Sequence, residues 1–186
     1  MGQTPLANSQ TPWGLSMHEL LLSTSRFNVE RREFAGADGR PGTREVVVHP
    51  GAVVILPILD PGHIVMIRNY RYTVEEELWE LPAGTAEMDE SPIETARREL
   101  EEETGYRAGT IKPLTEFYTS PGVLTERMFA FVAGDLQSVG QRLEHGERIV
   151  AEVVAWDRVR RWLVNGELHD GKTIAVLGTY FARTAQ

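Results

Sequence analysis

Four glutamates are crowded into the stretch RRELEEETGYR, which spans residues 97–107. Like charges three or four residues apart on a helix repel each other by about 0.2–0.5 kcal/mol per pair. At about 100° per residue, Glu99, Glu102 and Glu103 fall within one arc of about 100°, whereas Glu101 points elsewhere. Carboxylate oxygens suit hard cations such as Mg²⁺ or Mn²⁺, and a bound cation would turn the repulsion into coordination. The spacing therefore indicates a metal-binding face, with an ordinary solvated acidic face as the alternative.

The helix that would position these glutamates has recognisable ends. Ser91 can cap it, Pro92 suits the first helical position, and Glu94 stands where the second partner of a capping box belongs. Gly105 supplies the stop. The sequence therefore predicts a helix over Pro92–Thr104.

One side of this helix is expected to face the core, and the opposite side the solvent. The expected core residues are Ile93, Ala96, Leu100 and Thr104. Glu101 shares its side with Glu94, Arg97 and Arg98, where surface pairing is available, including the Glu94 to Arg98 spacing that favours an ion pair. The three-glutamate face has no Lys or Arg interleaved on it, which favours the metal-binding interpretation.

The segment that begins at Gly84, GTAEMDESPIETARRELEEETGY, resembles the Nudix box. That pattern is Gly-x5-Glu-x7-Arg-Glu-U-x-Glu-Glu-x-Gly-U, where U is a bulky apolar residue. The matching positions are Gly84, Glu90, Arg98, Glu99, Leu100, Glu102, Glu103 and Gly105. Tyr106 is a loose fit, because it is aromatic where an aliphatic residue is usual. The resemblance implies an internal ion pair between Glu90 and Arg98 that fixes the loop against the helix.

The resemblance also implies a metal site and a reaction. Glu99 and Glu103 would be the principal ligands, Glu102 a ligand or water-mediated partner, and Ala83 a donor through its backbone carbonyl. Nudix enzymes hydrolyse a nucleoside diphosphate linked to another group. Mg²⁺ or Mn²⁺ would neutralise the diphosphate and lower the pKa of a bound water.

A second segment narrows the expected substrate. FYTSPGVLTE, Phe117–Glu126, places Pro121 fifteen residues after Tyr106, and this resembles the ADP-ribose pyrophosphatase branch of the family. Arg71 matches an arginine that approaches the substrate diphosphate in that branch. The expected substrate contacts are thus Arg71, Pro121 and Glu126. The alternatives are a plain turn, since Pro-Gly is common in turns, and an ordinary surface arginine.

The branch tends to take its general base from a mobile loop late in the chain. The corresponding loop here is Gly140–Ile149, GQRLEHGERI. Its candidates are Glu144 and Glu147, either of which could approach the attacking water when substrate closes the site. The alignment does not choose between them, and His145 is a weaker candidate.

Composition limits the function classes. The 186 residues carry a net charge of −8, with 41% hydrophobic and 25% charged residues and no cysteine. An acidic chain has no excess of Lys and Arg to displace phosphate counterions, so nucleic acid is not an expected partner. Cysteine chemistry is excluded. No apolar run suits a membrane span, and the first residues lack a secretory signal, so a cytoplasmic protein without a membrane partner is expected.

The remaining elements predict an α/β protein with a mixed sheet. Expected strands are Leu20–Ser25, Asn28–Phe34, Glu45–His49, Gly51–Leu59, Ile64–Tyr70, Ile111–Thr119, Arg127–Ala133 and Ile149–Trp156. Further helices are expected at Asp157–Asn165 and Asp170–Arg183, with a polar loop at Gly134–Arg148. The order matches the Nudix fold, an α/β/α sandwich with an N-terminal β extension.

Three segments are expected along the chain: a flexible tail over 1–12, a β extension over 13–50 that could form a dimer contact, and a Nudix hydrolase domain over 51–186. Related enzymes of the branch are homodimers whose N-terminal strands cross to the partner, so a homodimer is expected here. Trp13, Phe27 or Phe34 could then supply an aromatic surface for adenine, although a place in the core is the simpler role.

The sequence therefore predicts an enzyme that hydrolyses ADP-ribose or a related nucleoside diphosphate sugar with Mg²⁺ or Mn²⁺, giving a nucleoside monophosphate and a sugar phosphate. A GDP-mannose or other sugar-nucleotide or dinucleotide hydrolase is a close alternative. A nucleoside triphosphate sanitiser and a non-catalytic Nudix sensor are further ones. The intact Glu99, Glu102 and Glu103 argue against the sensor, because a pure binder has no need for a repulsive cluster.

Overall fold

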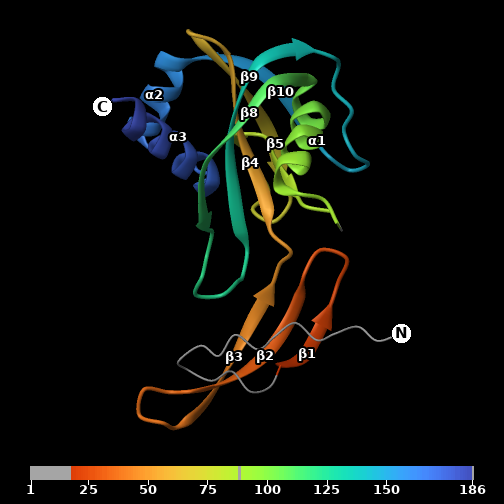
Figure 1. Ribbon diagram of the computed structural model, residues 1–186, viewed down its shortest axis with the longest axis vertical. Coiled ribbons are helices and arrows are strands. Elements are labelled where there is room, and N and C mark those ends of the chain that lie inside the picture. Colours follow the sequence, from red (N-terminus) through yellow and green to blue (C-terminus); the bar gives the residue numbers. More distant parts are fainter. Residues whose placement is uncertain (1–17, 88, 186) are drawn as a thin grey trace. The chain divides into compact units, whose positions relative to one another are not determined.

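The structure is a computed structural model that describes residues 18–87 and 89–185. Its described residues form ten strands and three helices (Figure 1). They group into two compact units, one made of residues 18–49 with Ser120–Thr125, the other of Pro50–Thr119 with residues 126–185. The expected flexible tail over 1–12 lies outside the described residues.

The smaller unit is an antiparallel sheet in the order β1 (His18–Ser23), β2 (Asn28–Ala35) and β3 (Pro41–Val48). Arg31 of β2 stands directly opposite Glu19 on one side and Glu45 on the other. Its guanidinium bonds both carboxylates at 3.1 Å. Opposite charges at directly paired positions favour this register.

A segment from later in the chain completes this unit. The backbone N of Val47 donates to the carbonyl of Val123 at 2.9 Å, and the N of Thr125 donates to the carbonyl of Val47 at 2.9 Å. The turn around Pro121 therefore pairs with β3 rather than continuing the strands on either side of it.

The larger unit is a seven-stranded mixed sheet. Its main path is β10 (Ile149–Ala155), β5 (His63–Arg71), β4 (Ala52–Asp60), β9 (Arg127–Ser138) and β8 (Tyr106–Tyr118). The short β6 (Glu76–Glu80) pairs with β5, and β7 (Ala83–Thr85) pairs with β4. The β4–β9 pair is parallel, and the other pairs are antiparallel. The predicted mixed sheet is confirmed.

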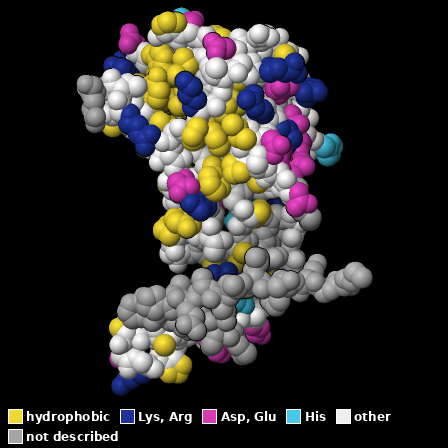
Figure 2. Space-filling model, in the orientation of Figure 1, with side chains coloured by type: hydrophobic (Ala, Val, Ile, Leu, Met, Phe, Trp, Pro, Cys, Tyr) yellow, Lys and Arg dark blue, Asp and Glu magenta, His cyan; other side chains and the backbone are white. Residues whose placement is uncertain are grey.

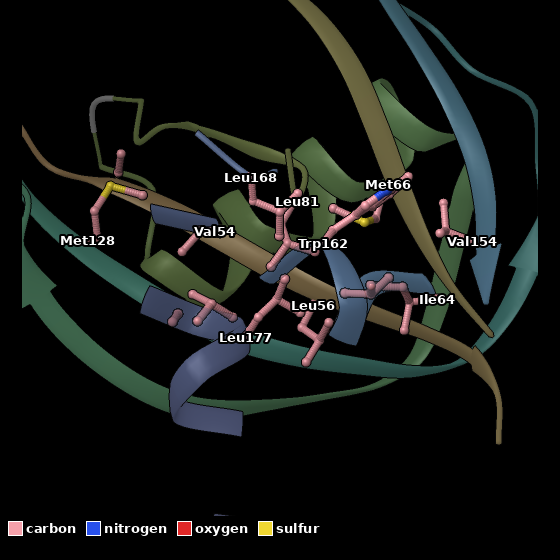
Figure 3. Packing of buried hydrophobic residues seen from close by; sticks show 14 residues of the cluster. Val54, Leu56, Ile64, Met66, Leu81, Met128, Val154, Trp162, Leu168 and Leu177 are labelled. Atoms are coloured by element: carbon pink, nitrogen blue, oxygen red, sulfur yellow. The ribbon is translucent and has the colours of Figure 1, made fainter. Parts of the chain in front are cut away.

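Helices cover both faces of this sheet, as the side chains of β4 show. Val53 and Ile55 face α1 (Pro92–Thr104) and pack with Ala96 and Leu100. The alternate residues of β4 face α2 (Trp156–Asn165) and α3 (Gly171–Thr184). There Val54 and Leu56 pack with Trp162 and Leu177 (Figure 3). Val159 and Val176 belong to the same cluster. A strand buried on both faces reads as a continuous apolar run, and the arrangement confirms the predicted α/β/α sandwich.

Helix α1 has the predicted bounds. Its N-terminus carries the expected capping box, with the backbone N of Ser91 donating to Glu94 at 2.9 Å, and Gly105 ends it at φ 73°. The predicted core face is correct for Ala96, Leu100 and Thr104 and wrong for Ile93, which is 39% exposed. The buried side includes Thr95, Glu99 and Glu103 instead, because β7 also packs against this helix.

Several strand bounds differ from the prediction, and β6 and β7 were not predicted. The largest differences are at β8 and β9. β8 begins at Tyr106, directly after the helix, and β9 continues to Ser138 inside the expected polar loop. Tyr106 pairs with Ser138 and Ala108 with Leu136. The two segments satisfy each other's backbone groups as strands although their composition is polar.

We expect Leu100→Ala to lower the free energy of unfolding by about 2–5 kcal/mol, because Leu100 of α1 is fully buried against β4 and truncation leaves a cavity. Ile93→Ala on the same helix is the matched control and should cost less than about 1 kcal/mol. Urea unfolding measures both changes. Equal losses would contradict the observed orientation of α1.

Candidate active site

Two carboxylates of α1 are buried in the larger unit. Glu103 is 3% exposed and Glu99 is 8% exposed. The Glu103 carboxylate accepts a hydrogen bond of 2.7 Å from the backbone N of Ala83 in β7. Burial raises the pKa of Glu99 to about 7, against the opposing pull of the Arg98 charge, and burial raises the pKa of Glu103 well above its usual value. Both side chains are therefore poised to gain from a neutralising cation.

Gly84 makes room for one of these carboxylates. A Cβ at position 84 would lie 1.9 Å from Oε1 of Glu99. The side chain of Glu99 thus fits against the β7 backbone only because residue 84 is glycine. This contact gives the first glycine of the box a steric role.

Arg98 connects the box loop to the glutamate face. Its guanidinium bonds Glu90 at 3.1 and 3.0 Å, which is the pair implied by the family resemblance. The same group also donates to Glu99 at 2.8 Å and to Glu102 at 3.1 Å. The prediction that no Arg lies on the three-glutamate face is therefore wrong. Arg98 reaches it because its side chain is long and Glu102, four residues further along the helix, is its neighbour on the helix surface.

The predicted Glu94 to Arg98 pair is also wrong. The Glu94 carboxylate is used by the capping box at Ser91, and Arg98 turns to the other side. Glu101 stays apart from the buried carboxylates, as predicted, and pairs with Arg107 at 2.7 Å and Arg142 at 3.4 Å.

The donor chemistry of this face fits a divalent cation. The buried carboxylates of Glu99 and Glu103 are hard oxygen donors, as Mg²⁺ or Mn²⁺ require. Within residues 18–87 and 89–185, no three acidic or histidine side chains converge as a finished metal site. Arg98 instead forms ion pairs with Glu99 and Glu102. Its two bonds to Glu90 would remain if a cation took over those carboxylates.

A pocket of about 650 Å³ opens beside β7. Arg71, Ala83 and Glu126, three of the residues predicted to act at the site, line it together with Gly84. The hydroxyl of Thr119 donates to Glu126 at 2.6 Å. Pro121 is not among the lining residues, and it belongs to the smaller unit.

One wall of the pocket holds a buried network of charges. Glu80 is fully buried and receives bonds from Arg71 at 2.7 and 2.5 Å. Lys172 donates to Glu80 at 2.5 Å and to Asp170 at 2.8 Å. Asp170 also caps α3 by accepting from the backbone N of Thr173 at 3.0 Å. Two cations and two anions thus share the wall, which keeps buried charges paired.

Sequence reasoning missed Glu80, Asp170 and Lys172 as site residues. Lys172 carried a usable signal, because a cation in the first turn of a helix opposes the helix dipole. A lysine at such a position needs nearby negative charge to compensate it, and the carboxylates of Glu80 and Asp170 provide that charge. The lining also includes Phe117, Tyr118 and Met128, whose side chains are largely apolar.

The two candidate bases differ in their surroundings. Glu144 is exposed, whereas Glu147 is partly buried and accepts from the backbone N of Glu144 at 2.8 Å. The charge of Glu147 contributes to the raised pKa values of both Glu99 and Glu103. Glu147 is therefore electrostatically coupled to the buried carboxylates. His145 is exposed.

The N-terminal aromatic residues have separate surroundings in the smaller unit. Phe34 lies against Gly42, and the guanidinium of Arg44 stands 5.5 Å from its ring centre. Phe27 is 37% exposed. Trp13 lies outside the described residues.

Residues 48–176 match the family described as NUDIX domain. The chain is 40% identical over 138 residues to the ADP-ribose pyrophosphatase of Bacillus subtilis (strain 168), covering 73% of this chain and 75% of that protein. It is 36% identical over 139 residues to the methanol dehydrogenase activator of Bacillus methanolicus, covering 74% of this chain and 75% of that protein. A solved structure titled "Crystal structure of ADP compounds hydrolase" superposes with a TM-score of 0.80 at 22% identity, over 95% of this chain and 96% of that one, and so shares the fold.

No helix among the described residues is long and apolar enough to cross a membrane. On the visible face of the larger unit, Lys and Arg side chains are interspersed with Asp and Glu side chains (Figure 2). The net charge of −8 is therefore not gathered into a single acidic field on that face.

We expect Glu99→Gln to raise the melting temperature of the metal-free protein, by an amount that grows as the pH rises from about 5 to 8. The pKa of Glu99 is raised from 4.5 to about 7, so between these values the folded protein binds this proton more tightly than the unfolded chain does. The contribution of Glu99 to stability is full below about pH 4.5 and is lost as the pH passes 7. Glutamine cannot ionise and escapes that loss.

Thermal unfolding in a chelator measures the difference, on the order of 5 °C near pH 8. Glu33→Gln, the same replacement at an exposed position of β2, is the matched control and should leave the melting temperature nearly unchanged. A gain for Glu99→Gln that shrinks as the pH rises would contradict the direction of the shift.

Proposed function

Because the chain belongs to the Nudix family of hydrolases, we propose that it cleaves the diphosphate bond of ADP-ribose or a related nucleoside diphosphate sugar. The products would be a nucleoside monophosphate and a sugar phosphate. The observation that carries the proposal is the position of the β7 backbone, with the buried Glu99 and Glu103 against it and the 650 Å³ pocket beside it. The name of the B. subtilis relative supports this substrate.

Glu99 and Glu103 would hold the divalent cation, with Glu102 and the carbonyl of Ala83 as further donors. Mg²⁺ or Mn²⁺, when bound, supplies charge neutralisation for the diphosphate and lowers the pKa of water. The protein's own contribution is to keep the donors in place. Gly84 provides space for Glu99, and the N–H of Ala83 orients Glu103.

Arg71 and Lys172 would bind the substrate's diphosphate oxygens. Both are held by Glu80, so neither needs to be ordered when substrate arrives. The planar guanidinium can bond two phosphate oxygens, and the ammonium adds a compact charge. Phe117 and Met128 in the lining offer apolar surface to a sugar or a nucleobase.

Glu147 would be the general base. Its partial burial and its coupling to Glu99 and Glu103 favour it over the exposed Glu144. Glu147 would take a proton from the attacking water as the diphosphate bond breaks.

A homodimer formed through the smaller unit and a cytoplasmic location complete the proposal. Leu20 and Leu22 of β1 are 58% and 52% exposed, and Leu21 between them is 40% exposed. Three adjacent exposed leucines on an edge strand are costly in water and would be covered by a partner copy.

A screen of nucleoside diphosphate sugars, dinucleotides and triphosphates with Mg²⁺ or Mn²⁺ tests the reaction. We expect ADP-ribose to give AMP and ribose 5-phosphate, and Glu103→Gln to lower kcat by roughly 10²-fold or more without unfolding the protein. A preference for GDP-mannose over ADP-ribose would change the assigned substrate to another sugar nucleotide and leave the reaction type unchanged. Pyrophosphate release from triphosphates alone, or tight binding without turnover, would contradict the proposal.

Comparison of Glu147→Gln with Glu144→Gln tests the base. General-base catalysis contributes about 10²–10⁴-fold, so Glu147→Gln should lower kcat by at least about 10²-fold with little change in KM. Glu144→Gln is the matched control in the same loop and should keep kcat within about threefold. A larger loss at Glu144 would reverse the assignment.

A further inference from the structure

The C-terminus of α1 is joined to the loop that follows β9. A helix leaves its last carbonyl groups without partners inside the helix. At this end, the carbonyl of Glu102 accepts a bond of 3.0 Å from the backbone N of Arg142, and the carbonyl of Gly105 accepts one of 2.8 Å from the N of Val139. Backbone groups of the loop therefore cap the helix that carries the acidic face.

One side chain extends this connection across the loop. Nε2 of Gln141 donates to the carbonyl of Glu103 at 2.6 Å and lies 3.4 Å from the carbonyl of Ile149, the first residue of β10. Both partners are acceptors, so the NH₂ group of the amide must face them. Gln141 thereby links the start of the loop, its end and the last turn of α1.

The loop approaches the helix end too closely for a side chain at position 105. A Cβ on Gly105 would lie 2.6 Å from the backbone N of Gln141 and 2.9 Å from the carbonyl carbon of Gly140. The last glycine of the box thus has two roles. It adopts φ 73° to end the helix, and it leaves space for the loop backbone.

We propose that Gln141 is a positioning residue that fixes Glu147 relative to the buried carboxylates of α1. The span between its contacts, residues 142–148, contains Glu147. Each bond of Gln141 removes freedom from that span, because it ties one end to the helix and the other to β10. The proposal rests on the proposed function, in which Glu147 is the base.

The arrangement gives Glu103 two independent functions. Its side chain belongs to the candidate metal face, and its backbone carbonyl anchors the loop through Gln141. The base and the acidic face therefore share one rigid support, the last turn of α1. A misplacement of about 1 Å at a reacting group can cost about 10²-fold in rate, so such a support has a catalytic consequence.

Gln141→Glu tests the proposal, because the carboxylate has nearly the same shape but no N–H to donate to two carbonyl groups. We expect kcat to fall about tenfold or more, with KM and the Mg²⁺ concentration for half-maximal rate changed less than about twofold. Amide hydrogen exchange of residues 142–149 should become faster in the same variant. Gln137→Glu, an exposed position of β9 with the same charge change, is the matched control.

Combination with Glu147→Gln separates positioning from a general structural role. If Gln141 acts through Glu147, Gln141→Glu should cost little further rate once Glu147 has been replaced. Additive losses, or unchanged exchange in the loop, would overturn the proposal. An inactive parent protein would contradict the proposed function, while hydrogen exchange would still decide whether Gln141 fixes the loop.

Discussion

The burial of two carboxylates against β7 is the constraint on which the rest of the larger unit depends. Glu99 and Glu103 are nearly inaccessible to water, and each ionised form is costly there unless it is compensated. The compensation comes from three sources: the N–H of Ala83, the guanidinium of Arg98 and, in the proposed function, a divalent cation. Gly84 is needed because a Cβ would occupy the space of the Glu99 carboxylate. The glycines, glutamates and arginine of the box therefore meet two requirements, which are space for the buried carboxylates and compensation of their charge.

Local features of the chain were readable from the sequence. The bounds of α1 follow from Ser91, Pro92, Glu94 and Gly105, all of which act within a few residues of themselves. The mixed sheet and the α/β/α layers follow from the apolar runs and their order. Helical geometry alone separates Glu101 from Glu99, Glu102 and Glu103, and in the structure Glu101 pairs with Arg107 and Arg142 instead.

Contacts between distant segments were not readable in the same way. Ile93 lies on the expected apolar stripe, yet it is exposed because β7 draws the buried side toward Glu99. The reach of Arg98 to three carboxylates depends on a side-chain conformation, which spacing does not reveal. Glu80 and Lys172 are 92 residues apart in the sequence and meet at 2.5 Å. Residues Ser120–Thr125 pair with β3, although the chain on both sides of them belongs to the larger sheet.

The wall of the pocket shows how the protein can keep cations ready for an anionic substrate without leaving them bare. Arg71 and Lys172 are paired with Glu80 and Asp170, so the wall is close to neutral before substrate binds. A bound diphosphate would meet Arg71 and Lys172, which already have carboxylate partners. The favourable binding energy would come from hydrogen bonds to those N–H groups of the two cations that Glu80 and Asp170 do not use. An additional cation on the acidic face would then balance the substrate's charge. Cations that are already paired with carboxylates would bind a diphosphate weakly by themselves. A divalent cation held by the nearby buried carboxylates would add the positive charge that the diphosphate needs, so that the charges in the complex nearly cancel. The acidity of the chain and its proposed substrate are therefore compatible.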